Sequence, residues 1–218
     1  ACGGEKETVS KKPESSSQVS SSEPSIPQLS GPSGVEITPN VEKEKIWGGK
    51  VAERITLGGG TEEYPYLIET PSELAYAVST GGGGAYYKLV NDIYLNDVSS
   101  DNWYEKKDVK KWYSSVFSGH IDGDGHCVYG IYFDQNSPPK YAGLISEFSG
   151  GSIKNLGVRK SRIFAQAYSG GIAGVANGDQ QKVFENCFVD ETVLFEELKA
   201  HAVFIHTGGV VVIMSAGA

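Results

Sequence analysis

An irregular internal repeat of short apolar runs is the feature that most constrains the fold of this chain. Residues 128–133, 153–158 and 184–189 each carry apolar side chains at the first, fourth and sixth places, and Asn155 and Asn186 share the third place. Self-similarity at a spacing of a few tens of residues is typical of solenoids, in which each repeat forms one coil and stacks on the previous one.

A second series runs beside the first, with AGLIS at 142–146, GGIAG at 170–174 and GGVVV at 208–212. Glycine accounts for 28 of the 218 residues without the period of collagen, which indicates many tight turns and therefore short strands. Several short strands per repeat, with asparagine at a bend, predict an all-β fold for residues 46–218. We expect a parallel β-helix whose coils lie about 4.8 Å apart.

The alignment of the repeats predicts which side chains stack inside this β-helix. Equivalent places in successive coils lie over one another because neighbouring strands are parallel and in register. Two interior ladders are expected, one of Ile131, Leu156 and Cys187 and the other of Val128, Ile153 and Phe184.

One short helix is predicted near the start of the folded part. Thr70 is a good N-cap, Pro71 suits the first helical position, and Glu73 completes a capping box. We expect this helix to cover the open apolar end of the first coil. Its apolar face consists of Leu74, Ala77 and Val78.

Five motifs follow one another between residues 56 and 189: GGGTEEYPYLIETPSELAYAV, YYKLVNDIYL, FSGHIDGDGHCVYGI, YAGLISEFSGGSIKNLGV, and SGGIAGVANG with FENCFV. They resemble bacterial surface proteins with GLUG-type repeats, which share a G-T-x-x-x-P-Y-x-I opening, an L-x-x-D-I-x-L strand and an F-x-G-x-x-D-G-x-G-H turn. The resemblance implies a right-handed parallel β-helix on the outside of a bacterium, and it implies no catalytic residues.

The first 45 residues differ from the rest in composition. Ser, Pro, Gly and mixed charges dominate residues 1–45, so we expect a disordered tether that cannot bury enough apolar surface to offset its chain entropy. Its first residues, Ala1 to Gly4, resemble the processed end of a bacterial lipoprotein, in which the cysteine is acylated. This implies a lipid on Cys2 and an extracytoplasmic protein anchored at the cell surface. A chance cysteine at a disordered terminus is the alternative.

The stretch HIDGDGH has features of both a metal site and a turn. We predict a turn between two strands of one coil, in which the glycines supply positive φ and the aspartates bond the turn N–H groups. An EF-hand is not expected because its twelfth place is Ile131 rather than glutamate. Asp122 and Asp124 remain weak metal candidates, and no cofactor is expected. The stretch contains His120, Asp122, Gly123, Asp124, Gly125 and His126.

Cys127 and Cys187 are predicted to be free thiols. They lie two coils apart, roughly 9 to 10 Å, which exceeds the Cα separation of about 7 Å that a disulfide can bridge. We expect Cys187 in the core and Cys127 facing outward beside Val128.

Residues 101–117 interrupt the strand pattern with a charged segment that contains Trp103, Tyr104, Trp112 and Tyr113. Two Trp-Tyr pairs on a loop could stack on sugar rings or hold a protein partner. Alternatively, the aromatic side chains fold back onto the wall of the β-helix while the neighbouring lysines stay solvated.

Charge and hydropathy restrict the partners. The net charge of -8 argues against nucleic acid, whose phosphates need clustered Lys and Arg. No apolar run approaches the roughly 20 residues of a membrane-spanning helix. The sequence therefore predicts a non-catalytic binding or adhesion protein that meets the membrane only through its lipid. Its expected partner is a glycan or a host or cell-surface protein. Self-association through the C-terminal end is also expected, because a final Gly-Gly-Val strand would leave an open edge.

A carbohydrate-active enzyme, either a polysaccharide lyase or a glycosidase on a β-helix scaffold, is the alternative. Asp92, Asp122 and Asp134 could meet on one face, although each also fits a turn or a strand end. A groove lined by carboxyl groups with shifted pKa values would favour the enzyme, and a wall of exposed aromatic side chains would favour binding.

The first testable prediction concerns the N-terminal cysteine. Mass spectrometry of the protein isolated from its native host should find an acyl-modified Cys2, because the Ala-Cys-Gly-Gly sequence is followed directly by a Ser-rich tether. Detection of Cys2 only in its unmodified form would contradict the lipid anchor.

Overall fold

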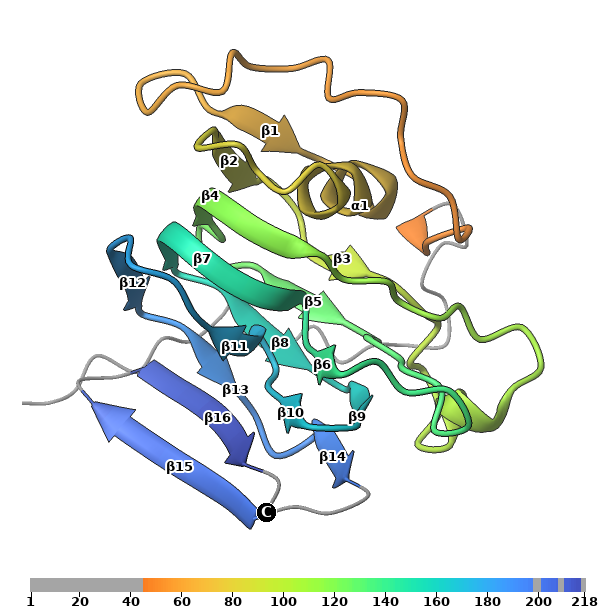
Figure 1. Cartoon of the computed structure of the whole chain (residues 1–218). Helices are drawn as coiled ribbons and strands as arrows, with labels where there is room; N and C mark the ends of the chain where they lie inside the picture. The colour runs from red at the N-terminus through yellow and green to blue at the C-terminus, as the bar shows by residue number, and fades with distance from the viewer. Residues whose placement is uncertain (1–44, 198–200, 208–209, 217–218) are drawn as a thin grey trace, which may run out of the picture.

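Short parallel strands stacked in successive coils form the body of the protein (Figure 1). The computed structural model describes residues 45–197, 201–207 and 210–216, so nearly all of the predicted tether, Cys2 included, lies outside the described residues. The predicted parallel β-helix is confirmed, and it includes a single short α-helix among the described residues.

One long wall of the β-helix, called here the first wall, is a parallel sheet built from successive coils. Strand β7 is long enough to pair with both β11 and β12. The strands of the first wall are β1 (Tyr66–Ile68), β2 (Tyr86–Leu89), β4 (Val116–Asp122), β7 (Ile145–Lys154), β11 (Ala173–Ala176) and β12 (Lys182–Glu185).

The rest of each coil is made of shorter strands. A second parallel sheet, called here the second wall, contains β3 (Ile93–Tyr94), β5 (Cys127–Tyr129), β8 (Gly157–Arg159) and β13 (Phe188–Val189). Two parallel pairs complete the coils: β6 (Tyr141–Ala142) with β10 (Tyr168–Ser169), and β9 (Arg162–Ala165) with β14 (Leu194–Glu197).

Apolar side chains in register fill the interior. Ile121 and Ile153 are partners on the first wall, and they are 1% and 0% exposed. Full burial of such a side chain contributes roughly 1.5–3 kcal/mol, so stacked apolar residues can hold neighbouring coils together. The interior ladders of the two walls are Tyr66, Tyr87, Ile121, Ile153 and Phe184, and Ile93, Val128, Val158 and Val189.

The predicted alignment of the last two of the three repeats is confirmed, but that of the first is wrong. Phe184 lies opposite Ile153, as expected, whereas Val128 lies opposite Val158 rather than Ile153. Ile131 is therefore not stacked on Leu156 and Cys187.

Ile131 lies further along the coil, where its N–H donates to Ser161 Oγ at 3.0 Å. The error has a physical origin, since the same apolar spacing occurs on both walls of a coil. The turn at 123–126 is also two residues longer than the turn at 155–156. Aligning the repeats by apolar spacing alone therefore placed a strand of the second wall, β5, opposite the end of β7 on the first wall.

Asparagine forms the corner between the two walls, as the repeat predicted. Asn155 and Asn186 have φ values of 52° and 51°, and Asn186 Nδ2 donates to Asn155 Oδ1 at 3.2 Å. Asparagine tolerates this left-handed conformation better than most residues, and its amide can bond to the next corner. The second series is confirmed where Ala173 lies opposite Ile145.

The predicted helix is confirmed as α1 (Pro71–Ser79), with both bonds of its capping box present. The Glu73 N–H donates to Thr70 Oγ1 at 3.3 Å, and the Thr70 N–H donates to Glu73 Oε2 at 3.0 Å. The three residues of the predicted apolar face are fully buried, and α1 lies beside β1 and β2 at the N-terminal end of the stack (Figure 1). Within the described residues, no helix has the length and apolar character needed to cross a membrane.

The C-terminal region differs from the prediction. Residues 210–216 were expected to continue the second series as a third parallel strand, after AGLIS and GGIAG. Instead, β16 (Val210–Ala216) pairs antiparallel with β15 (His201–Thr207). A hairpin needs only a tight turn, whereas a parallel return needs a dozen or more residues of connection. The hairpin lies at the end of the stack, below the last coil (Figure 1).

Both described cysteines are free, as predicted, and both are buried. Cys187 is a core residue, whereas Cys127 lies on the outer side of the second wall in a separate apolar cluster with Tyr94, Trp103 and Tyr129. Burial raises the pKa of each thiol from its ordinary 9.0 to about 11.

The second prediction tests the interior ladder. Leu156→Ala should lower the free energy of unfolding by about 2–5 kcal/mol, because Leu156 is fully buried and its truncation leaves a cavity. Asp124→Asn is the control, since it keeps a residue that tolerates φ of 50° and removes only an exposed ion pair worth less than about 1 kcal/mol. Equal losses in chemical denaturation would contradict the role given to the ladder.

The third prediction concerns the thiols. In a Cys2→Ser variant, neither Cys127 nor Cys187 should react with a disulfide reagent at about pH 8, and both should react after unfolding. Their folded pKa values lie above the unfolded value, so their stabilising contribution is complete below pH 9.0 and is lost as the pH rises toward 11. Thiol titration and pH-dependent denaturation measure both effects. Rapid labelling of the folded chain would contradict the burial.

Candidate ligand-binding face

The aspartate-glycine stretch is a corner of the β-helix, as predicted. Strand β4 ends at Asp122 and β5 begins at Cys127. The Asp122 carboxylate accepts the Asp124 N–H at 2.9 Å and Asn155 Nδ2 at 2.9 Å. Asp122 thus continues the asparagine ladder of the corners, and the turn bond expected of it is present.

The two glycines of this corner have different roles, which corrects the prediction that both supply positive φ. Gly125 does so, with φ of 85°, and Asp124 has φ of 50°. Gly123 is required by a close approach instead. A Cβ atom at this position would lie 2.4 Å from the Asn155 carbonyl oxygen and 2.7 Å from Leu156 Cα in the next coil.

Both histidines of the stretch have partners. His126 Nδ1 lies 3.3 Å from Asp92 Oδ1, and His120 Nδ1 lies 2.9 Å from Ser152 Oγ. The Asp124 carboxylate pairs with Lys88 Nζ at 3.1 Å. In the part of the chain that the structure describes, no three His, Cys, Asp or Glu side chains gather as metal ligands.

The structure does not bring the three candidate carboxylates of the enzyme interpretation together as a set. Asp92 accepts the Cys127 N–H at 2.9 Å, Asp122 holds the corner, and Asp134 lies beyond β5, where it pairs with Lys111. Hydrogen bonds from Lys111 and from the Asn136 backbone lower the pKa of Asp134. A general acid requires the opposite direction, because it must hold its proton near neutral pH.

The four candidate aromatic side chains of the insertion have different environments. Trp103 and Trp112 are 5% and 2% exposed, Tyr104 is half-buried, and Tyr113 is 76% exposed. The indole N–H of Trp112 donates to the Leu144 carbonyl at 2.9 Å, which fixes the ring in the wall. Three of the four therefore fold back onto the wall, which leaves Tyr113 as the exposed member of the group.

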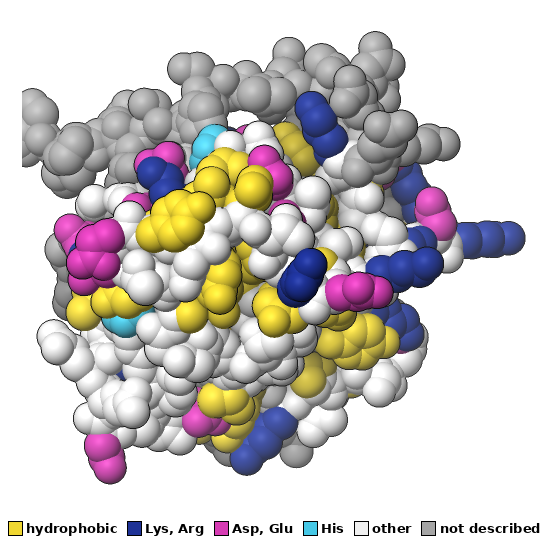
Figure 2. Space-filling model, turned by 90° about the horizontal axis from the view of Figure 1, so that it is seen from above, with side chains coloured by type: hydrophobic (Ala, Val, Ile, Leu, Met, Phe, Trp, Pro, Cys, Tyr) yellow, Lys and Arg dark blue, Asp and Glu magenta, His cyan; other side chains and the backbone are white. Residues whose placement is uncertain are grey.

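This insertion covers part of the outer face of the second wall. Trp103 of the insertion and Val98 just before it pack on Tyr94, Cys127 and Tyr129, which face away from the interior. Lysine and arginine side chains gather on the side of the molecule that carries the insertion (Figure 2). The second wall is thus closed to a large ligand over β3 and β5.

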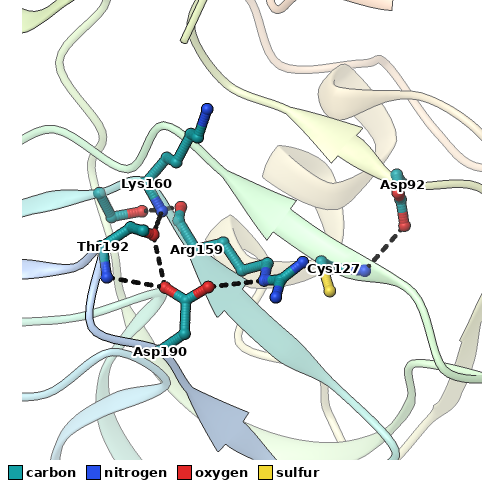
Figure 3. A network of polar contacts seen from close by, with 7 residues as sticks. Asp92, Cys127, Arg159, Lys160, Asp190 and Thr192 are labelled. Atoms are coloured by element: carbon teal, nitrogen blue, oxygen red, sulfur yellow. Dashed lines mark hydrogen bonds and ion pairs between the residues drawn. The ribbon is translucent and has the colours of Figure 1, made fainter. Parts of the chain in front are cut away.

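Further along the second wall, polar side chains bond to one another. Arg159 Nε donates to Asp190 Oδ2 at 2.6 Å, and Thr192 Oγ1 accepts the Lys160 N–H at 2.7 Å (Figure 3). Asp190 also accepts from the Thr192 N–H and hydroxyl. These contacts fix the corner that follows β8, where Lys160 has φ of 41°.

The outer face of the first wall is open and carries two columns of register partners that cross β2, β4, β7 and β12. A groove of ≈ 590 Å³ follows these columns. We call them the polar column and the charge column. The polar column contains Tyr86, His120, Ser152 and Val183, and the charge column contains Lys88, Asp122, Lys154 and Glu185.

Sequence reasoning missed most of this groove. It singled out His120 for a turn or a metal, and Asp122 for a turn, a metal or an enzyme. It did not select Tyr86, Ser152 or Lys154. The available signal was alternation, since every second residue of β2 and β4 faces outward, as do Ser152 and Lys154 on either side of the buried Ile153 in β7. Only the correct register between coils shows that these outward residues form columns.

Comparison with known proteins gives two partial matches. The chain is 29% identical over 137 residues to a protein of Evansella cellulosilytica described as "Putative Gly-rich membrane protein", with 61% of this chain and 15% of that protein covered. It is 25% identical over 142 residues to halomucin of Haloquadratum walsbyi, with 62% of this chain and 2% of halomucin covered. The chain therefore spans only a small part of either relative. No family model and no solved structure matches.

Proposed function

We propose that this chain is a non-catalytic binding or adhesion protein that displays the first wall outside a bacterial cell. The observation that carries the proposal is the contrast between the walls. The insertion covers the outer face of the second wall over β3 and β5, whereas the first wall presents a groove of ≈ 590 Å³. A concave site of this size, lined by aromatic and polar side chains, is suited to bind a ligand.

The chemistry of the groove supports binding rather than catalysis. Asp122 accepts two hydrogen bonds at its corner, and Lys88 and Lys154 pair with Asp124 and Glu185 at 3.1 and 3.0 Å. These ion pairs occupy both lysines of the groove, so neither is a free amine that could act as a nucleophile or a general base.

Surface display is supported by the N-terminal sequence and by the comparisons. Lipidated Cys2 and a tether over residues 1–45 would hold the β-helix away from the membrane. The name of the Evansella relative includes the words membrane protein, which agrees with such a location. The proposed partner is a glycan or a protein on a host or neighbouring cell.

The fourth prediction tests this function with arrays of glycans and extracellular proteins. The purified full chain should bind at least one ligand saturably and release no cleavage product, with and without calcium. Tyr86→Ala should abolish binding, because Tyr86 lines the groove, whereas Tyr113→Ala should leave it unchanged.

Three outcomes would contradict parts of this proposal. Absence of binding to every class of ligand would argue against a binding protein. Release of shortened glycans would favour the enzyme. Loss of binding in Tyr113→Ala alone would move the site from the first wall to the insertion.

A further inference from the structure

The two lysines of the groove are held in ion pairs, and its remaining charged groups, Glu62 and Asp122, are acidic. In the charge column, Lys88, Asp122, Lys154 and Glu185 alternate in sign over consecutive strands. Lys154 is neutralised by Glu185 at 3.0 Å, and this hydrogen bond raises the Lys154 pKa. Lys88 is neutralised by Asp124. A highly charged ligand would have to compete with these ion pairs, and an anionic ligand would also meet Asp122.

The polar column offers hydrogen bonds of mixed direction. The rings of Tyr86 and His120 stack at 4.0 Å between centroids with 8° between their planes. His120 uses Nδ1 for Ser152, and Asp122 uses Oδ1 for its corner bonds. Among the described residues, no hydrogen bond is formed by the Tyr86 hydroxyl, His120 Nε2 or Asp122 Oδ2. A phenol, a ring nitrogen and a carboxylate oxygen together can both donate and accept.

These features select among ligand chemistries. An apolar ligand would bury the three polar atoms without partners, which is unfavourable. A hydroxyl group both donates and accepts, so a ligand with many hydroxyl groups can satisfy all three atoms without carrying charge. The groove crosses four strands in successive coils, so it accommodates an extended chain along the axis of the β-helix.

We propose that the groove of the first wall binds a neutral, hydroxyl-rich glycan chain through Tyr86, His120 and Asp122. The stacked rings hold the phenol and imidazole in fixed positions, and the corner bonds hold the carboxylate. This proposal rests on the proposed binding function and specifies its ligand.

The fifth prediction is tested by titrating the full chain with neutral oligosaccharides of glucose, mannose or galactose, and with polygalacturonate and heparin as acidic glycans. At least one neutral series should bind saturably, with an affinity that changes little with sodium chloride. Tyr86→Phe should weaken this binding about two- to tenfold, because it removes one hydroxyl but keeps the ring.

Tyr168→Phe is the matched control, because Tyr168 is also half-buried and ring-stacked, on Tyr141 at 5.6 Å, but does not line the groove. The affinity of Tyr168→Phe for the neutral glycan should equal that of the unaltered chain. Circular dichroism and thermal unfolding should show that both variants are folded. Equal affinities of Tyr86→Phe and the unaltered chain for the neutral glycan would overturn the site.

The remaining outcomes separate the ligand from the function. Binding only to an acidic glycan or to a protein, with loss in Tyr86→Ala, would overturn the neutral-glycan proposal and leave the binding function standing. Absence of binding to any glycan or protein would overturn both.

Discussion

Parallel stacking in register is the constraint on which the rest of this structure depends. Because each strand lies beside its equivalent in the next coil, a side chain has a register partner about 4.8 Å away on either side. Interior places must therefore stay apolar from coil to coil, as in the ladder through Ile121 and Ile153. Outer places must avoid like charges on adjacent strands, and the alternation of Lys88, Asp122 and Lys154 meets that requirement.

The same constraint explains the corners. A turn that changes wall must leave room for the turns above and below, so its residues are selected by contact as well as by conformation. Asn155 and Asn186 adopt positive φ and bond to each other, whereas Gly123 allows Asn155 and Leu156 to pass closely. In the sequence, Asp122 and Asp124 most resembled a metal or catalytic site. In the structure they belong to a corner, where Asp122 bonds to Asn155 of the next coil and Asp124 pairs with Lys88.

The sequence was sufficient to predict features that depend on neighbouring residues, such as short strands and a capped helix. It was not sufficient to predict which strands of successive coils lie opposite each other. Apolar spacing and glycine content were sufficient to predict the parallel β-helix, and Thr70 and Glu73 were sufficient to predict α1. The spacing could not distinguish the two walls of one coil, so Val128 was aligned with Ile153 instead of Val158. The groove was missed for the same reason, because Tyr86 and His120 become neighbours only when the register between coils is known.

The composition of the outer columns also accounts for which wall is covered and which is open. On the second wall, Tyr94, Cys127 and Tyr129 face outward. Packing of Trp103 and Val98 over this apolar surface removes it from water, which stabilises the folded protein. Burial accordingly raises the pKa of Cys127 and of Tyr129. On the first wall the outward residues are lysines, carboxylates and hydrogen-bonding rings, whose burial under a loop would cost desolvation. That wall can remain in contact with solvent, and a ligand that replaces the hydrogen bonds of water can bind there.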